Sequence, residues 1–127
     1  MRTAEEIAAT IPKENKHGDC FEIHLKLLPL QPEYKLVHGI VTGQGPIEGI
    51  KLCHCWIERT TATPFGDVVM VMDFSNGNSH TMSAKTYYKI GEIDPDSIVR
   101  YDPLEARGLA DIHGHYGPWH QLPIDVC

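Results

Sequence analysis

The sequence lacks an apolar run long enough to cross a membrane. Its longest apolar stretches fall far short of the ~20 residues that a membrane-spanning helix needs. The first residues also lack the basic segment followed by an apolar segment that marks an export signal. We therefore expect a cytoplasmic protein with no membrane partner.

A surplus of positive charge is also missing. The 127 residues include 11 Lys and Arg against 17 Asp and Glu, which gives a formal net charge of −6. Nucleic acids attract proteins through basic surfaces that neutralise phosphates, and no long run of Lys and Arg interrupts the acidic balance. The composition therefore argues against a nucleic-acid partner.

Internal repeats, low-complexity segments and a distinct linker are absent as well. Gly and Pro residues punctuate the chain at short intervals and do not gather in one stretch. A chain of this length buries enough surface for one core. We expect a single domain over residues 1–127.

The spacing of apolar and turn-forming residues predicts a mixed structure. Helices are expected over four segments, residues 3–10, 20–28, 83–90 and 103–112. Strands are expected over residues 34–41, 50–59, 67–74 and 98–101, with a Gly-rich loop at 43–49 and a turn at 75–79. Neighbouring strands are close enough in sequence to pair antiparallel. The predicted class is α+β, an antiparallel sheet packed against the N-terminal helix that carries Cys20.

What the sequence has in quantity is histidine and cysteine, eight and four residues respectively. In a chain without an export signal, these residues indicate either a metal site or thiol chemistry. Cys20 falls in the first turn of a predicted helix, where the helix dipole and unpaired N–H groups favour a thiolate and can bind an oxyanion. Cys20 is therefore the candidate nucleophile.

Two further residues complete a catalytic set. Strand alternation places His54 on the face opposite Cys53 and Cys55. Asp73 ends a run of apolar residues in the next predicted strand, where a carboxylate needs a partner, and pairing of the two strands brings it within reach of His54. We expect Cys20 to be the nucleophile, His54 the general base and then acid, and Asp73 the residue that orients His54.

Three short motifs surround these residues: Gly18-Asp19-Cys20, His54-Cys55-Trp56-Ile57-Glu58 and Val71-Met72-Asp73. Together they resemble the papain-like cysteine hydrolase superfamily, in particular its transglutaminase-like and bacterial cell-wall-peptidase branches. The chain is also similar to a group of small phage and bacterial proteins, through the segments 43–49, 73–77, 87–88 and 114–119. The resemblance implies a thiol protease or amidase of a bacterial cell, encoded by the bacterium or by a phage. It implies cleavage of an amide, isopeptide or thioester bond in a protein or peptide substrate, without a cofactor.

A side chain that would help the backbone N–H of Cys20 to bind the oxyanion is less evident. Papain-like enzymes place a Gln or another amide a few residues before the nucleophile, and Asn15 is the residue of this chain near that position. Gln44 in the Gly-rich loop is the other candidate. Cross-linking transferases surround their Cys with aromatic residues, whereas only Phe21 adjoins Cys20, so we expect hydrolysis in preference to acyl transfer.

Two alternatives stay open at this stage. Cys53-His54-Cys55 holds ligand types that zinc prefers, but it lacks the usual two intervening residues, so we expect no metal and assign both cysteines to the core. We expect Trp56 to pack beneath the site and Glu58 to be a solvated charge at a strand end. The second alternative is a non-catalytic phage or mobile-element protein that uses the same fold to sequester or inhibit a host factor.

Overall fold

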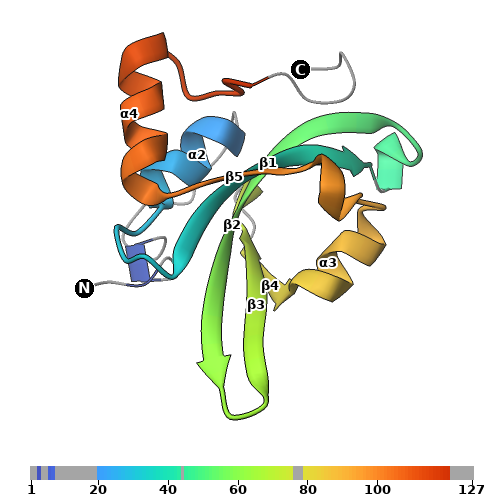
Figure 1. Cartoon of the computed structure of the whole chain (residues 1–127). Coiled ribbons are helices and arrows are strands. Elements are labelled where there is room, and N and C mark those ends of the chain that lie inside the picture. Colours follow the sequence, from blue (N-terminus) through green and yellow to red (C-terminus); the bar gives the residue numbers. More distant parts are fainter. Residues whose placement is uncertain (1–2, 4–5, 8–19, 44, 76–78, 121–127) are drawn as a thin grey trace.

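The computed structural model describes residues 3, 6–7, 20–43, 45–75 and 79–120 (Figure 1). Within these ranges, five strands form one antiparallel sheet in the order β4-β3-β2-β1-β5. The strands are β1 (Tyr34–Thr42), β2 (Lys51–Thr63), β3 (Gly66–Asp73), β4 (His80–Ser83) and β5 (Val99–Tyr101). The helices are α2 (Cys20–Leu27), α3 (Ala84–Ile90) and α4 (Pro103–His113), and two 3-10 turns are η2 (Gly45–Ile47) and η4 (Pro95–Ser97). The α+β class and the helix that begins at Cys20 are confirmed.

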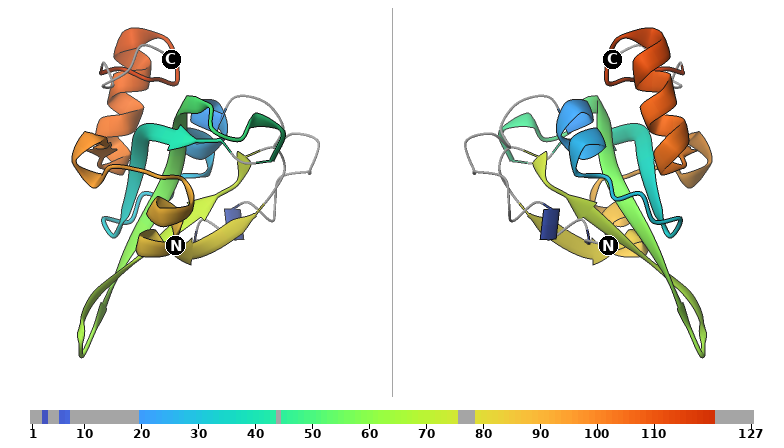
Figure 2. Two further views of the ribbon diagram at one scale, coloured as in Figure 1. Left: turned by 90° about the vertical axis from the view of Figure 1, so that its right-hand side faces the viewer. Right: turned by 90° about the vertical axis from the view of Figure 1, so that its left-hand side faces the viewer.

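One strand, β2, is longer than predicted, and another, β4, was not predicted. β2 runs to Thr63, and with β3 it forms a hairpin whose outer part, residues 60–69, projects from the body of the molecule (Figure 2). β4 was not predicted, because its four residues are too few for a period-two pattern. It is held by pairing with residues 70–73 of β3. The predicted helix at 3–10 lies mostly outside the described residues.

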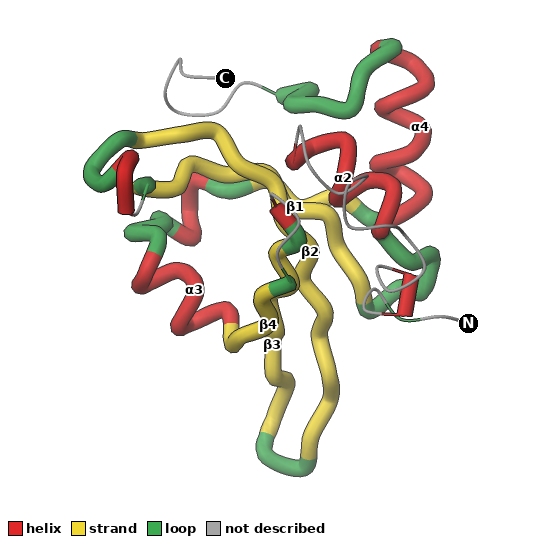
Figure 3. The backbone as a smooth tube through the Cα atoms, turned by 180° about the vertical axis from the view of Figure 1, so that it is seen from behind, coloured by secondary structure: helices red, strands yellow, loops and turns green. Residues whose placement is uncertain are grey.

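The two faces of the sheet carry separate apolar clusters. Because side chains alternate along β2, Cys55 and Ile57 contribute to one cluster while Trp56 contributes to the other. The first cluster contains residues of α2 and α4, and the second contains Ala84 at the start of α3. Figure 3 shows α2 and α4 together on one side of the molecule and α3 on the other.

Helix α3 is fixed at both ends to the sheet. Ser83, the last residue of β4, caps its N-terminus by accepting a hydrogen bond from the backbone N–H of Thr86 at 3.2 Å. At the other end, the backbone N–H of Thr42 in β1 donates to the carbonyl of Gly91 at 2.8 Å. These anchors hold the Tyr87 and Tyr88 side chains over β2.

No helix among the described residues is both long enough and apolar enough to cross a membrane.

Candidate active site

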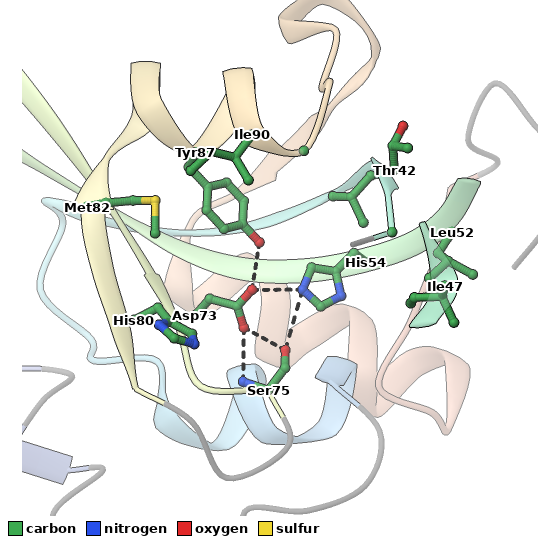
Figure 4. A pocket seen from close by; sticks show the side chains of 13 residues that line it. Thr42, Ile47, Leu52, His54, Asp73, Ser75, His80, Met82, Tyr87 and Ile90 are labelled. Carbon is green, nitrogen blue, oxygen red and sulfur yellow. Dashed lines mark hydrogen bonds and ion pairs between the residues drawn. The ribbon is translucent and has the colours of Figure 1, made fainter. Parts of the chain in front are cut away.

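The three expected catalytic residues come from three different elements. Cys20 is the first residue of α2, His54 lies near the start of β2, and Asp73 is the last residue of β3. The ring Nε2 of His54 lies 2.9 Å from Oδ2 of Asp73, and the other ring nitrogen points away from that carboxylate (Figure 4). The side chain of His54 is 20% exposed and that of Asp73 is 13% exposed. A partly buried imidazole is thus held by a carboxylate and leaves its second nitrogen free of it.

Asp73 is a carboxylate with hydrogen-bond donors on both oxygens. Oδ2 accepts from His54 and from the hydroxyl of Tyr87, the latter at 2.6 Å. Oδ1 accepts from the backbone N–H of Ser75 at 2.9 Å and from its hydroxyl at 2.6 Å (Figure 4). Donors of this number favour the ionised form of a carboxyl group. Although burial opposes ionisation, the hydrogen bond and charge of His54, with His24 and Ser75, hold the pKa of Asp73 well below its ordinary value.

The same contacts act in the opposite direction on His54. Burial alone would lower the pKa of this imidazole. The hydrogen bond that His54 donates to Asp73, its hydrogen bond with Cys20 and the charge of Asp73 outweigh that effect, and they raise the pKa of His54 to about 10. His54 therefore favours the imidazolium form at neutral pH.

His24 is a buried neighbour of this site that the sequence pattern did not identify. Its Nδ1 donates to the carbonyl of Cys20 at 2.7 Å, and its Nε2 accepts from the backbone N–H of Phe74 at 3.0 Å. Burial lowers its pKa to about 4, against the charge of Asp73 and the hydrogen bond to Cys20. Neutral His24 thus ties the first turn of α2 to the end of β3. Its position four residues after Cys20, on the same side of a helix, was the available signal.

Tyr87 and Ser75 are the other two site residues that sequence reasoning missed. Tyr87 donates to Asp73 from α3, and burial together with the charge of Asp73 raises the pKa of its hydroxyl, so it stays a neutral donor. Ser75 follows Asp73 by two residues and forms the local turn that this spacing favours. The two adjacent tyrosines were visible in the sequence, but the hydrogen bond from Tyr87 to Asp73 depends on where α3 packs.

An apolar cavity of about 490 Å³ adjoins His54 (Figure 4). It lies between α3, the ends of β1 and β2, β4 and the loop that contains η2. Asp73 and Ser75 also line it. The predicted Gly-rich loop therefore borders the cavity through Gly43 and Ile47.

Glu58 does not have the environment predicted for it. It is 2% exposed, so the interpretation as a solvated charge is wrong. Its carboxylate accepts from Trp56 Nε1 at 3.0 Å, from Arg100 Nε at 3.0 Å and from the hydroxyl of Tyr88. Position at a strand end suggested solvent, but Tyr88 of α3 and Arg100 of β5 cover the carboxylate. Trp56 packs beneath the site as expected, with its ring centroid 6.2 Å from that of His54.

The remaining sequence predictions fall on other surfaces or outside the described part. Cys55 is buried and Cys53 packs against the same cluster on the face away from His54, as expected for core residues. Cys53 is also disulfide-bonded. The oxyanion candidates Asn15 and Gln44 lie outside the described residues. Comparison with protein-family models, with curated proteins and with solved structures finds no match for this chain.

Proposed function

We propose that this protein is a small cysteine hydrolase with a papain-like minimal core. It cleaves an amide, isopeptide or thioester bond in a protein or peptide substrate. The observation that carries the proposal is the 2.9 Å contact between His54 and Asp73, together with the position of Cys20 as the first residue of α2. A nucleophile, a base and a group that orients the base are the parts that thiol catalysis requires.

Cys20 is the nucleophile of the reaction, and His54 moves the protons. Cys20 sulfur, its proton transferred to His54, attacks the substrate carbonyl carbon, and the carbonyl electron pair moves to oxygen. The backbone N–H of Cys20 at the start of α2 stabilises this oxyanion. As the oxyanion collapses, the bond to the leaving group breaks and the imidazolium of His54 gives its proton to that group. Water, deprotonated by His54, then releases the acyl group from Cys20.

Asp73 contributes by holding His54 and by balancing its charge. Its four hydrogen bonds leave it little freedom to rotate, so the ring of His54 keeps one orientation. A fixed carboxylate behind the imidazole favours the protonated ring that the transition states contain.

Thiol labelling tests the proposal without knowledge of the substrate. Among the described residues Cys20 and Cys55 are not disulfide-bonded, and Cys55 is 0% exposed. Iodoacetamide followed by peptide mass spectrometry should modify Cys20 first, and His54→Ala should slow that modification about tenfold or more. Cys20→Ala should abolish hydrolysis and leave the circular dichroism spectrum unchanged. Labelling of Cys20 that ignores His54→Ala would contradict the proposal.

A second candidate is a binding protein without catalysis, and one observation favours it. The β2–β3 hairpin projects from the body, and Phe65 at its tip is 99% exposed (Figure 1). Exposed aromatic side chains at a projecting position are typical of protein contacts. If this candidate is right, a Cys20→Ala protein keeps its effect on a host factor, whereas Phe65→Ser loses it.

A further inference from the structure

The cavity beside His54 has the lining of an apolar binding site. Its wall includes five aliphatic side chains from five different elements or loops: Val41, Ile47, Leu52, Met82 and Ile90. Neither Lys nor Arg is among the described residues that line it. The single carboxylate in the lining, Asp73, has both oxygens occupied by donors from the protein. Among the described lining residues, a cationic ligand would therefore find no unpaired carboxylate, and the cationic ring of His54 is already paired with Asp73.

Two of these aliphatic side chains are left uncovered. Ile47 is 44% exposed and Ile90 is 50% exposed, on either side of the cavity (Figure 4). Covering apolar surface next to a concave site with an apolar group removes that surface from water and lowers the free energy. An occupant of matching chemistry is an alkyl or other uncharged apolar group.

The position of the cavity indicates which part of a substrate it holds. His54 lines the cavity, whereas Cys20 is not among its described lining residues. In a cysteine hydrolase the acyl group becomes attached to the nucleophile, and the leaving group accepts a proton from the histidine. The group nearest the cavity is therefore the one that His54 protonates.

We propose that this cavity binds an apolar leaving group of the substrate. This inference rests on the proposed hydrolase function. Cys20 sulfur forms a bond to the carbonyl carbon while the bond from that carbon to the leaving heteroatom breaks. The proton of the His54 imidazolium goes to that heteroatom, and the neutral product remains briefly in the cavity while water hydrolyses the acyl enzyme.

A series of acetyl thioesters tests the assignment, because alkanethiols of different length have nearly the same basicity. With the acetyl group constant, kcat/KM should rise about three- to fourfold for each added CH₂ from the ethyl to the hexyl thioester. Lengthening the acyl chain of an ethyl thioester instead should leave kcat/KM nearly flat. Product release is followed by chromatography, with Cys20→Ala as the blank. A dependence on acyl length and not on thiol length would overturn the assignment.

A pair of matched variants locates the effect. Ile90→Asn should reduce the ratio of kcat/KM for hexyl over ethyl thioester about tenfold, because it places an amide in the apolar wall. Ile112→Asn on α4 changes the same residue type at a position that is 79% exposed and does not line the cavity, and it should keep the wild-type ratio. Equal ratios in the two variants would overturn the assignment.

Binding of 1-hexanol to Cys20→Ala separates the two hypotheses. We expect the alcohol to shift the methyl NMR signals of Leu52 and Ile90 and to leave those of Ile112 unchanged. If these shifts occur but no thioester is cleaved by the wild-type protein, the hydrolase function and the leaving-group role both fail and an apolar binding site remains. If thioesters are cleaved through Cys20 with no dependence on length and no shifts, the hydrolase stands and the cavity assignment fails.

Discussion

His38 and His54 lie on the paired strands β1 and β2, where His38 is opposite Cys55 and the next residue, Gly39, is opposite His54. His38 is 1% exposed and packs against the rings of Phe21 and Tyr101, with centroids 4.8 and 5.0 Å away. Neither of its ring nitrogens has a hydrogen-bond partner among the described residues. Burial, with smaller effects from His120 and His24, lowers the pKa of His38 to about 3.

The side chain of His54 is also largely buried, yet its pKa is raised and not lowered. The difference between the two sites is the carboxylate of Asp73, which His54 contacts at 2.9 Å and which has no counterpart beside His38. Burial alone makes histidine a neutral aromatic side chain, whereas burial beside a fixed carboxylate makes it a base. Pairing with Asp73 thus suits His54 to proton transfer, whereas His38 is a packing residue of the core.

Removing the carboxylate gives the largest expected effect. Asp73→Asn should lower kcat/KM on the order of 10³- to 10⁴-fold and slow the labelling of Cys20, since the imidazolium loses its balancing charge. The pKa of His54 should fall from about 10, because the hydrogen bond and charge of Asp73 no longer oppose the effect of burial. NMR titration of His54 measures this directly. His38→Phe is the control, and the comparison breaks if this variant slows labelling as much as Asp73→Asn.

Acid should destabilise the protein through the two buried neutral histidines. The folded pKa values of His24 and His38, about 4 and about 3, lie below the unfolded value of 6.5. Between pH 6.5 and pH 4 the unfolded chain therefore binds protons that the folded chain excludes, and the free energy of unfolding falls as the pH is lowered. The loss at pH 4 should be about 3 kcal/mol for each histidine.

His54 has the opposite sign and a different pH window. Its folded pKa of about 10 is above the unfolded value, so its stabilisation is complete below pH 6.5 and is lost as the pH rises through about 10. Urea unfolding at a series of pH values distinguishes the two groups. His38→Phe should reduce the slope on the acid side and leave the slope on the alkaline side unchanged. An acid slope that is the same in His38→Phe would show that His38 is not buried as a neutral ring.

The two adjacent tyrosines of α3 give a smaller and more selective effect. Tyr87 donates to Asp73, and Tyr88 donates to Glu58. Replacing either with Phe leaves a buried carboxylate short of one donor and should cost about 1–3 kcal/mol of unfolding free energy. Only Tyr87→Phe should also slow the labelling of Cys20, by severalfold, because Glu58 does not contact His54. Equal labelling rates in the two variants would remove Tyr87 from the positioning of Asp73.

The sequence allowed much of the fold to be predicted, because its signals are local. The start of α2 at Cys20, the alternation that separates His54 from Cys55, and the capped helix α4 all follow from periodicity and end-capping residues. β4 could not be predicted, because its four residues depend on pairing with β3. The length of β2 was underestimated because three of the four residues 60–63 are threonines and this part pairs with β3 outside the core.

The site was predictable only where order along the chain carried information. Cys20, His54 and Asp73 could be named because each sits at a recognisable place in its element. The contacts that tune them, from His24, Ser75 and Tyr87, depend on how α2 and α3 pack at the end of β3. The same cause explains the error at Glu58, where Tyr88 and Arg100 cover a charge that sequence position alone assigned to solvent.

The smallest expected effect on stability and on Cys20 labelling is that of a substitution at Phe65. Its ring is 99% exposed at the tip of the β2–β3 hairpin, in contrast to Trp56 in the same hairpin, which is 0% exposed. Phe65→Ser should change the free energy of unfolding by no more than about 0.5 kcal/mol and leave Cys20 labelling at the wild-type rate. Trp56→Ser, the matched change at the buried end, should cost about 3–5 kcal/mol. A large loss of stability in Phe65→Ser would mean that the tip packs against the body or a second copy, and size-exclusion chromatography at two protein concentrations distinguishes these cases.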